Sequence, residues 1–183
     1  MTRILIFGGA RSGKSAHAER LASVSDKDVI YIATAQIGDA EMATRIALHR
    51  HQRPSTWVTV EEPLALADVL LRSASPQCVV LVDCLTLWLS NQLFSDDTHY
   101  PDVGDIPLPA QFIAQRKKLL QVLTECQSDV ILVSNEVGMG IVPYGAISRC
   151  FTDEAGRLNQ DIAAVCDQVI FVAAGLPLIL KGG

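Results

Sequence analysis

The sequence predicts an α/β fold in which a mostly parallel β-sheet is flanked by helices. Short apolar runs rich in β-branched residues alternate with segments of helical spacing, which is the pattern of parallel strands joined by crossover helices. The runs are continuously apolar, as expected of strands that helices cover on both faces. The predicted strands span residues 3–7, 28–32, 57–60, 78–82, 129–133 and 168–172.

Four helical segments and a final strand complete the predicted elements. Apolar residues recur at helical intervals in 16–21, 64–71, 109–126 and 154–165. Residues 176–181 follow Gly175 and predict an antiparallel strand at the end of the sheet. The segment 95–109 is rich in Asp and Pro and has little periodicity, so we expect an exposed loop there, which could act as a lid.

Length and composition limit the classes of function. At 183 residues the chain fits one domain, 1–183, and 49% hydrophobic residues are enough for a well-buried sheet. A net charge of -5 without any run of Lys or Arg argues against nucleic acid as a partner. No apolar stretch approaches the roughly 18 residues of a membrane span, and the first strand begins without the zones of a signal peptide. We therefore expect a cytoplasmic protein that acts on small molecules.

The five cysteines are interpreted as reduced thiols. They are Cys78, Cys84, Cys126, Cys150 and Cys166. Their number is odd, and no pair has the C-x-x-C spacing of a metal or redox site. We therefore expect free thiols, mostly in the core, and no metal held by cysteine.

A complete phosphate-binding loop follows the first predicted strand. Its residues are Gly8, Gly9, Ala10, Arg11, Ser12, Gly13, Lys14 and Ser15, and a helical segment comes directly after them. In this pattern the glycines let backbone N–H groups turn inward around phosphate oxygens, the lysine reaches the outer phosphates and the last hydroxyl ligates Mg²⁺. A strand before the loop and a helix after it are the context in which the motif is functional. The sequence therefore predicts a nucleoside triphosphate site.

Polar residues follow the other predicted strands, at the edge where ligands bind in an open α/β sheet. They are Thr34 and Gln36, with Ala35 between them, after the second strand, Glu61 and Glu62 after the third, Asp83 after the fourth, and Ser134, Asn135 and Glu136 after the fifth. Because Asp83 follows four apolar residues, we interpret it as the Walker-B-type carboxylate that holds Mg²⁺ together with Ser15. The alternatives are a helix cap at Asp83 and solvated carboxylates at Glu61 and Glu136.

One histidine in the segment 39–53 is a candidate nucleophile. At helical spacing His49 lies on the apolar face, whereas His51 points to the opposite side. Arg45 and Arg53 stand four residues before and after His49, so two cations can flank its ring and favour the neutral, nucleophilic imidazole. Such an arrangement suits phosphoryl or nucleotidyl transfer through histidine. The spacing alone also fits a buried histidine of the core.

Several motifs, taken in order, resemble those of one enzyme family. They are Gly8-Gly9-Ala10-Arg11-Ser12-Gly13-Lys14-Ser15, Tyr31-Ile32-Ala33-Thr34-Ala35-Gln36, Asp39-Ala40-Glu41-Met42-Ala43-Thr44-Arg45-Ile46 leading to His49, Arg53-Pro54 with Trp57, Asn135-Glu136-Val137-Gly138-Met139-Gly140-Ile141-Val142-Pro143, and Ala155-Gly156-Arg157-Leu158-Asn159-Gln160. Over nearly its whole length the chain resembles the bifunctional adenosylcobinamide kinase/adenosylcobinamide-phosphate guanylyltransferases of cobalamin biosynthesis. It departs from the family pattern at Asp83, where Glu is common, and at Leu48, where relatives have a second histidine. The resemblance implies a P-loop NTPase fold with a RecA-like sheet, and a homotrimer with its site near a subunit boundary.

The resemblance also implies the reaction and its participants. ATP or GTP phosphorylates the aminopropanol hydroxyl of adenosylcobinamide, and adenosylcobinamide phosphate then accepts GMP from GTP through a guanylylated histidine. The catalytic residues would be His49 and Lys14, and Mg²⁺ would be held by Ser15 and Asp83. The implied GTP contacts are Gly8, Gly9, Ala10, Arg11, Ser12, Gly13, Lys14, Ser15, Thr34, Ala35, Gln36, Arg50, His51, Gln52, Arg53, Glu61 and Asp83, with Asn135 and Arg157 left outside this set.

Two other classes of function remain open from the residues alone. A plain small-molecule or nucleotide kinase would share the phosphate-binding loop and the sheet but would not need a histidine nucleophile. A nucleotide-binding switch would control a partner and show no acceptor-dependent turnover. The chain lacks the Asn-Lys-x-Asp motif with which switch GTPases recognise guanine, which argues against the switch.

Overall fold

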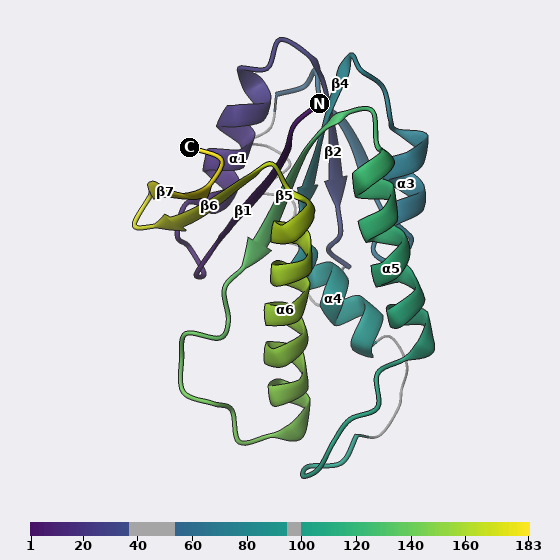
Figure 1. Ribbon diagram of the computed structural model, residues 1–183, viewed down its shortest axis with the longest axis vertical. Helices are drawn as coiled ribbons and strands as arrows, with labels where there is room; N and C mark the ends of the chain where they lie inside the picture. The colour runs from purple at the N-terminus through teal and green to yellow at the C-terminus, as the bar shows by residue number, and fades with distance from the viewer. Residues whose placement is uncertain (37–53, 95–99) are drawn as a thin grey trace.

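The structure is a computed structural model that describes residues 1–36, 54–94 and 100–183. Within these ranges the strands form one seven-stranded sheet in the order β3-β2-β4-β5-β1-β6-β7, in which only β7 is antiparallel to its neighbour (Figure 1). The strands are β1 (Arg3–Gly8), β2 (Asp28–Ala33), β3 (Val58–Glu61), β4 (Cys78–Asp83), β5 (Asp129–Asn135), β6 (Gln168–Ala173) and β7 (Leu176–Lys181). The helices are α1 (Lys14–Ser23), α3 (Leu66–Arg72), α4 (Leu85–Phe94), α5 (Ala110–Glu125) and α6 (Ala146–Val165).

The predicted α/β fold with its mostly parallel sheet is confirmed, and each predicted strand agrees with the observed one to within two residues. The last strand has the predicted bounds and is antiparallel to β6. Two helices differ from the predicted segments: α4 (Leu85–Phe94) is not among them, and α6 begins at Ala146 instead of residue 154. Ile147, Cys150 and Phe151 extend the apolar spacing of α6 in this direction, although only Ala146 among its first eight residues is buried. Residues 100–109 contain no helix or strand, and the predicted helical segment 39–53 lies outside the described residues.

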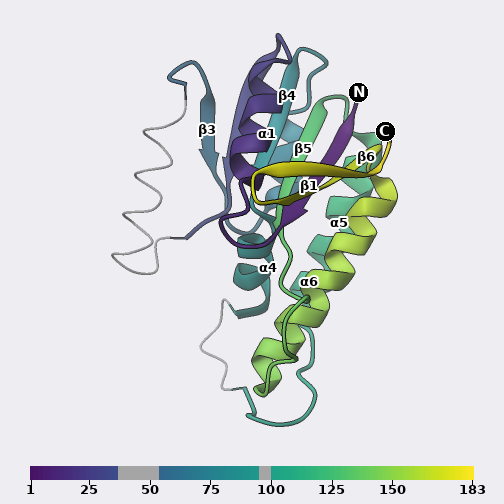
Figure 2. The ribbon, with the colours of Figure 1, turned by 90° about the vertical axis from the view of Figure 1, so that its left-hand side faces the viewer.

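The sheet separates two apolar cores, one on each of its faces, and Figure 2 shows the helices on both sides of the strands. On one face Ala18 and Ala22 of α1 pack in a cluster with Ile6, Leu81 and Ile131 from the strands. Successive residues of a strand point to opposite faces, so neighbouring strand residues contribute to different cores. α1, and therefore the loop before it, lies on the face of the sheet that carries this cluster.

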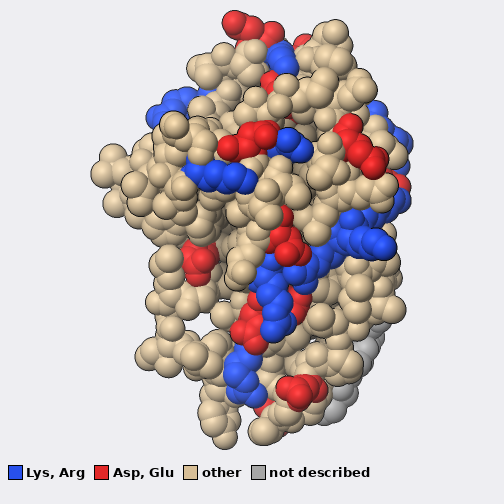
Figure 3. Space-filling model, viewed as in Figure 1, with Lys and Arg blue, Asp and Glu red and all other residues tan. Residues whose placement is uncertain are grey.

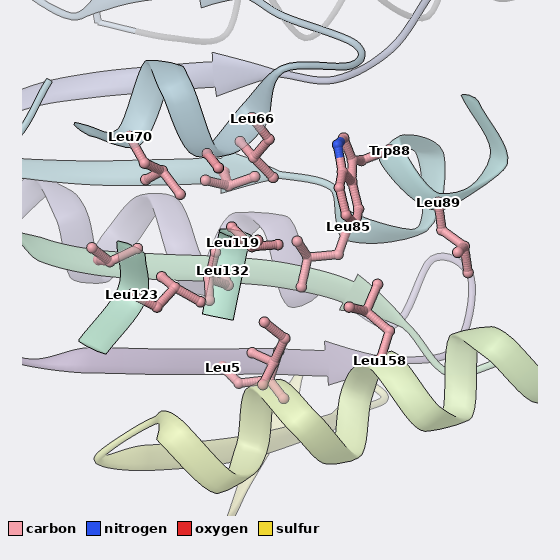
Figure 4. Close-up of a cluster of buried hydrophobic side chains, with 14 of the residues drawn as sticks. Leu5, Leu66, Leu70, Leu85, Trp88, Leu89, Leu119, Leu123, Leu132 and Leu158 are labelled. Carbon is pink, nitrogen blue, oxygen red and sulfur yellow. The ribbon is translucent and has the colours of Figure 1, made fainter. Parts of the chain in front are cut away.

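The opposite face is covered by α3, α4, α5 and α6. Leu5 and Leu132 from the strands pack there with Leu85, Trp88 and Leu158 from the helices (Figure 4). Trp88 is fully buried, and its Nε1 donates a hydrogen bond to the backbone carbonyl oxygen of Leu64, just before α3, over 2.9 Å. The contact joins α4, which directly follows β4 and the candidate site at its end, to the segment between β3 and α3.

The two edge strands differ from the expectation that helices cover both faces of every strand. No residue of β3 or β7 is fully buried, because each strand has a neighbour on one side only. Leu176, Leu178, Ile179 and Leu180 of β7 are between 51% and 72% exposed. Among the described residues, no helix combines the length and the apolar composition needed to cross a membrane.

Candidate active site

The phosphate-binding loop joins β1 to α1 at the carboxyl edge of the sheet. Its backbone turns sharply, with φ of 55° at Arg11 and 95° at Gly13, the residue before α1. Glycine suits the left-handed conformation that Gly13 adopts. Gly8 meets a different requirement, because a Cβ on it would lie 2.2 Å from the carbonyl oxygen of Val172 in β6. Glycine is therefore required at Gly8 by the close approach of β6 and is favoured at Gly13 by the turn of the backbone.

The loop holds its lysine in a buried position. Lys14 is 9% exposed, and its Nζ donates a hydrogen bond to the carbonyl oxygen of Gly9 over 3.2 Å. The Ser12 hydroxyl is buried and has no hydrogen-bond partner among the described residues. The first N–H groups of α1 have no partner within the helix, and the helix dipole favours an anion beside them. A buried cation, an unpartnered hydroxyl and a helix N-terminus together fit a phosphate group.

Asp83, the candidate Walker-B carboxylate, ends β4, with β5 between it and β1. Its Oδ2 accepts a hydrogen bond from the hydroxyl of Tyr31 over 3.0 Å. Tyr31 is buried, and its ring stacks on Trp57 with the ring centroids 6.5 Å apart. Tyr31 and Leu81 belong to the core under α1, and Asp83, two residues after Leu81, points to the same face. The carboxylate is thus held on the side of the sheet that carries the phosphate-binding loop and its helix.

Thr34 and Cys84 join the carboxyl ends of β2 and β4. The Thr34 hydroxyl donates to the Cys84 carbonyl over 2.7 Å and accepts from the Cys84 N–H over 2.9 Å. Thr34 is fully buried, so its side chain serves this junction. Burial, followed by the charge of the neighbouring Asp83, raises the pKa of the Cys84 thiol to about 11. The thiol therefore stays protonated at neutral pH and is not a nucleophile.

The end of β5 lies directly beside the phosphate-binding loop. The backbone N–H of Glu136 donates to the carbonyl oxygen of Gly8 over 3.0 Å. Glu136 Oε1 accepts from two backbone N–H groups that follow it, those of Gly138 at 2.5 Å and Met139 at 3.1 Å, which gives this carboxylate a role in shaping the turn. Asn135 uses its side-chain amide to bind the hydroxyl of Thr86 in α4 over 2.8 Å.

The two predicted metal ligands supply oxygen atoms, which Mg²⁺ prefers. Ser15 is half-buried in the first turn of α1, and Asp83 is half-buried at the end of β4. Within the described ranges, no group of three or more His, Cys, Asp or Glu side chains is placed to hold a metal ion. This donor set fits an ion whose coordination is completed by phosphate oxygens and water, and does not fit a metal enclosed by protein ligands alone.

The other predicted contacts are spread along the same edge. In the sheet register Gly8 is opposite Asn135, and Asp83 is opposite a residue of β5. Glu61 is the exposed last residue of β3, Ala35 is half-buried and Gln36 is exposed. His49, Arg50, His51, Gln52 and Arg53 lie outside the described residues. The structure therefore gathers the loop, Asp83 and the end of β5, and does not place the candidate nucleophile.

Two features of the site were missed by sequence reasoning. The first is Tyr31, whose alternation with Ala33 along β2 could have suggested that it faces the same side as the strand-end carboxylate. The second is Glu154, which is 1% exposed in α6 and forms ion pairs with Arg157 and, at 3.0 Å, with Arg116 of α5. The sequence signal that could have indicated its burial is the position of a charged residue inside an otherwise apolar helical stripe.

The sequence matches the family described as cobinamide kinase / cobinamide phosphate guanyltransferase over residues 4–180. The protein named bifunctional adenosylcobalamin biosynthesis protein CobP of Pseudomonas aeruginosa is 53% identical over 180 residues, which cover 98% of each chain. The one named bifunctional adenosylcobalamin biosynthesis protein CobU of Escherichia coli is 44% identical over 180 residues, which cover 97% of this chain and 99% of the relative.

Solved structures support the fold. A prototypical ATPase from the type III secretion system of pathogenic bacteria has a TM-score of 0.58 at 16% identity, over 97% of this chain and 56% of that one. The assembled ATPase EscN from the type III secretion system of enteropathogenic Escherichia coli has a TM-score of 0.55 at 15% identity, over 94% of this chain and 43% of that one. The chain thus spans about half the length of these ATPases. The likenesses confirm the predicted P-loop NTPase fold with a RecA-like sheet and show nothing further.

Proposed function

The chain belongs to the cobinamide kinase / cobinamide phosphate guanyltransferase family, and on this premise we propose that it catalyses two reactions. It first phosphorylates the aminopropanol hydroxyl of adenosylcobinamide with ATP or GTP. It then transfers GMP from GTP to the phosphorylated product. The second step would give adenosylcobinamide-GDP and pyrophosphate. The observation that carries the proposal is the family match over residues 4–180, in a chain whose phosphate-binding loop is complete from Gly8 to Ser15.

In the first reaction the loop and Lys14 hold the triphosphate, and the hydroxyl oxygen of the acceptor attacks the γ-phosphorus in line. A bond forms between that oxygen and phosphorus while the bond from phosphorus to the bridging oxygen breaks, a nucleoside diphosphate leaves, and the hydroxyl proton is released to water. Lys14 and the N-terminus of α1 stabilise the negative charge of the outer phosphates. Ser15 and Asp83 are the proposed ligands of Mg²⁺, which supplies further charge neutralisation when bound.

In the second reaction the imidazole of His49 attacks the α-phosphorus of GTP. A nitrogen–phosphorus bond forms and pyrophosphate leaves. A phosphate oxygen of adenosylcobinamide phosphate then attacks the same phosphorus and releases the histidine. Dividing one difficult transfer into two easier ones is the advantage of a covalent intermediate. The support for His49 is its position in the family motif and the spacing of Arg45 and Arg53 around it.

Contacts to the rest of GTP are proposed for residues at the carboxyl ends of β2 and β3 and for residues 50–53, which the family resemblance implies. They are Thr34, Ala35, Gln36, Arg50, His51, Gln52, Arg53 and Glu61. The hydroxyl of Thr34 binds Cys84, its backbone N–H binds Asp83 and its carbonyl oxygen accepts from Asn91, so the carbonyl oxygen, with its second lone pair, is the group of Thr34 that is left for a ligand. The position of Thr34, Ala35, Gln36 and Glu61 at the carboxyl ends of β2 and β3 supports the proposal for these four residues, because ligands of open α/β sheets bind at that edge.

The test is incubation of the protein with Mg²⁺ and GTP labelled at the α-phosphate, followed by intact mass measurement and by an assay of acceptor phosphorylation. We expect a mass increase equal to one GMP, and phosphate transfer that depends on adenosylcobinamide. Phosphate transfer without covalent GMP would replace the proposal by a plain kinase. Nucleotide binding without acceptor-dependent turnover would replace it by a nucleotide-dependent switch.

We further propose that the protein is a homotrimer that works in the cytoplasm. The apolar, exposed β7 at the sheet edge supports association, because unpaired edge strands with apolar side chains favour contact with another chain. All five cysteines are free thiols, which suits a reducing compartment. Light scattering of the purified protein would test the trimer.

A further inference from the structure

A cavity lies between α6 and the loop that leads into it from β5. We call residues 137–144 the β5–α6 loop. The cavity has a volume of about 520 Å³, and its lining includes Gly138, Ile141, Val142, Gly156, Arg157 and Gln160. Figure 3 shows the molecule hollowed between this loop and α6, with charged side chains gathered along the helix. The volume is that of a site for a small molecule or for one part of a larger one.

The cavity begins next to the phosphate-binding loop. Glu136 binds the carbonyl oxygen of Gly8 through its backbone N–H and binds the N–H of Gly138, a residue of the cavity wall, through its side chain. A molecule in the cavity would therefore lie beside the nucleotide site along the same edge of the sheet. This position suits an acceptor that must reach a bound nucleotide.

The loop side of the cavity offers an apolar surface held in place from α6. Ile141 and Val142, which line the cavity, are 97% and 76% exposed. Arg149 of α6 donates hydrogen bonds to the carbonyl oxygens of the last two residues of the loop, which ties the end of the loop to the helix. An apolar wall that is fixed at its end and largely exposed is suited to the apolar rim of a large ligand.

Arg157 is the cation of this cavity that is available to a ligand. Its neighbour Arg149 already binds backbone carbonyls, and the third charged residue of the lining is Asp153. The Arg157 side chain is 60% exposed, yet one of its nitrogens is held by the buried carboxylate of Glu154. The other oxygen of Glu154 is paired with Arg116, so the anchor is itself fixed. An arginine fixed at one nitrogen keeps further donors in a planar fork that matches phosphate.

Gly156 provides an independent observation that points to a ligand. It lies in the interior of α6, where glycine is less favourable than alanine because it has more conformational freedom to lose on folding. A Cβ at this position would meet nothing within 4 Å, so packing inside the chain does not require glycine. The residue lines the cavity. Close approach of a bound molecule to the helix backbone would explain it.

From these observations we propose that the cavity between the β5–α6 loop and α6 binds the corrinoid acceptor, with Arg157 contacting the phosphate of the phosphorylated form. The proposal rests on the proposed function and adds the acceptor site to it. The apolar loop packs against the methyl-bearing periphery of the ring, and the polar groups along α6 bind its amide side chains. A second cavity, of about 330 Å³, shares Arg149, Asp153 and Arg157 with the first and extends the site toward residues 104–108.

The first test compares the two acceptors in Arg157→Ala. Equilibrium dialysis, read by corrin absorbance with and without a non-hydrolysable GTP analogue, gives the affinity for adenosylcobinamide and for its phosphate. We expect the variant to bind the phosphate about tenfold or more weakly and the unphosphorylated acceptor within about twofold of wild type, because a charged hydrogen bond is lost for one ligand only. Arg157→Lys should recover part of the loss. The matched control is Lys118→Ala, which removes a cation of α5 paired with Asp68 of α3.

The second test uses Gly156→Ala and Gly156→Leu, with Ala164→Leu at an exposed position of the same helix as the control. Gly156→Ala should raise the thermal midpoint, because alanine favours the helix. Both Gly156 variants should weaken binding of both acceptors while the affinity for the GTP analogue stays unchanged. If no ligand lies beside Gly156, Gly156→Ala will raise the thermal midpoint and neither variant will bind the acceptors more weakly, which would contradict the proposal.

The outcomes separate this proposal from the function on which it rests. If wild-type protein binds and converts both acceptors and the Arg157 and Gly156 variants do so equally well, the acceptor site is elsewhere while the function stands. If wild-type protein binds GTP but neither acceptor, the function itself fails and the site with it. Ile141→Asp adds a third arm, because a change of oligomeric state with unchanged acceptor binding would make the β5–α6 loop a contact between copies of the chain and overturn the proposal.

Discussion

The hydroxyl of Tyr31 in β2 donates a hydrogen bond to Oδ2 of Asp83 at the end of β4, over 3.0 Å. The contact involves only one of the two carboxylate oxygens, and it restricts rotation of the carboxylate. Tyr31 in turn is fixed by burial and by its stacking on Trp57. We infer that Tyr31 orients the carboxylate that we propose as a ligand of Mg²⁺.

Tyr31→Phe should therefore raise the Mg²⁺ concentration needed for half-maximal binding of a fluorescent GTP analogue by about threefold to tenfold, since a contact worth roughly 1 kcal/mol no longer orients the ligand. The control is Tyr100→Phe, which removes a tyrosine hydroxyl bound to the carbonyl oxygen of Leu93 over 2.7 Å. Equal Mg²⁺ midpoints in wild type and Tyr31→Phe would show that Asp83 does not depend on this hydrogen bond.

Gly8→Ala should destabilise the protein, whereas Gly9→Ala should not. A Cβ on Gly8 would lie 2.2 Å from the carbonyl oxygen of Val172, so β1 and β6 would have to separate, while a Cβ on Gly9 would meet nothing within 4 Å. We expect a loss of about 1–3 kcal/mol in the free energy of unfolding for Gly8→Ala and less than about 0.5 kcal/mol for Gly9→Ala. Urea unfolding of the two variants measures the difference, and similar midpoints would contradict the close approach of the strands.

Lys14→Ala should lower both kinase and guanylyltransferase activity by about two orders of magnitude or more, because the charge that stabilises the outer phosphates during transfer is lost. The fold should survive, since the Nζ contact to Gly9 stays within the loop. Circular dichroism and steady-state assays check both expectations. The control is Lys27→Ala, a lysine paired with Asp129 at 2.7 Å, which should retain activity. A folded Lys14→Ala protein with nearly wild-type turnover would exclude this loop as the catalytic site.

His49→Ala should abolish GMP attachment and guanylyl transfer but leave phosphorylation of the acceptor hydroxyl largely intact, because only the second reaction needs a nucleophilic side chain. His51→Ala should retain both activities. Labelling with α-labelled GTP, followed by acid treatment, checks the assignment, since protonation of the imidazole makes it a good leaving group. Labelling that persists in His49→Ala and disappears in His51→Ala would assign the nucleophile to His51.

Stability should decrease as the pH falls below the ordinary histidine pKa of 6.5, through His17 of α1. Burial, and then the charge of Arg20, whose nitrogen is 2.7 Å from Nδ1, lower the pKa of His17 in the folded protein. Below pH 6.5 the unfolded chain binds a proton that the folded protein does not, so protonation favours unfolding until the pH reaches the folded pKa. His17→Gln should lose less stability than wild type between about pH 7 and about pH 5.5 in urea titrations. Parallel pH dependence in the two proteins would contradict the shift.

The sequence was sufficient to predict the strands and the phosphate-binding loop because both depend on local signals. Continuous apolar runs mark β1, β4 and β5 whatever lies beside them, and the glycine spacing of the loop is set by its own turn. Family motifs added the reaction and the candidate nucleophile His49. The start of α6 was predicted eight residues too late, although Ile147, Cys150 and Phe151 have helical spacing, because only Ala146 of its first eight residues is buried and this part of the apolar stripe is short.

The relationships within the site were decided by the tertiary structure. Tyr31 and Asp83 are 52 positions apart, and they meet only because β2 and β4 are neighbours in the sheet. Its charge alone does not distinguish Glu154 from an exposed residue in the sequence. Its burial between Arg116 and Arg157 follows from the packing of α5 on α6. Composition and local periodicity determine which segments become strands or helices. The strand order and the helix packing determine which side chains meet, because those contacts join residues that are distant along the chain.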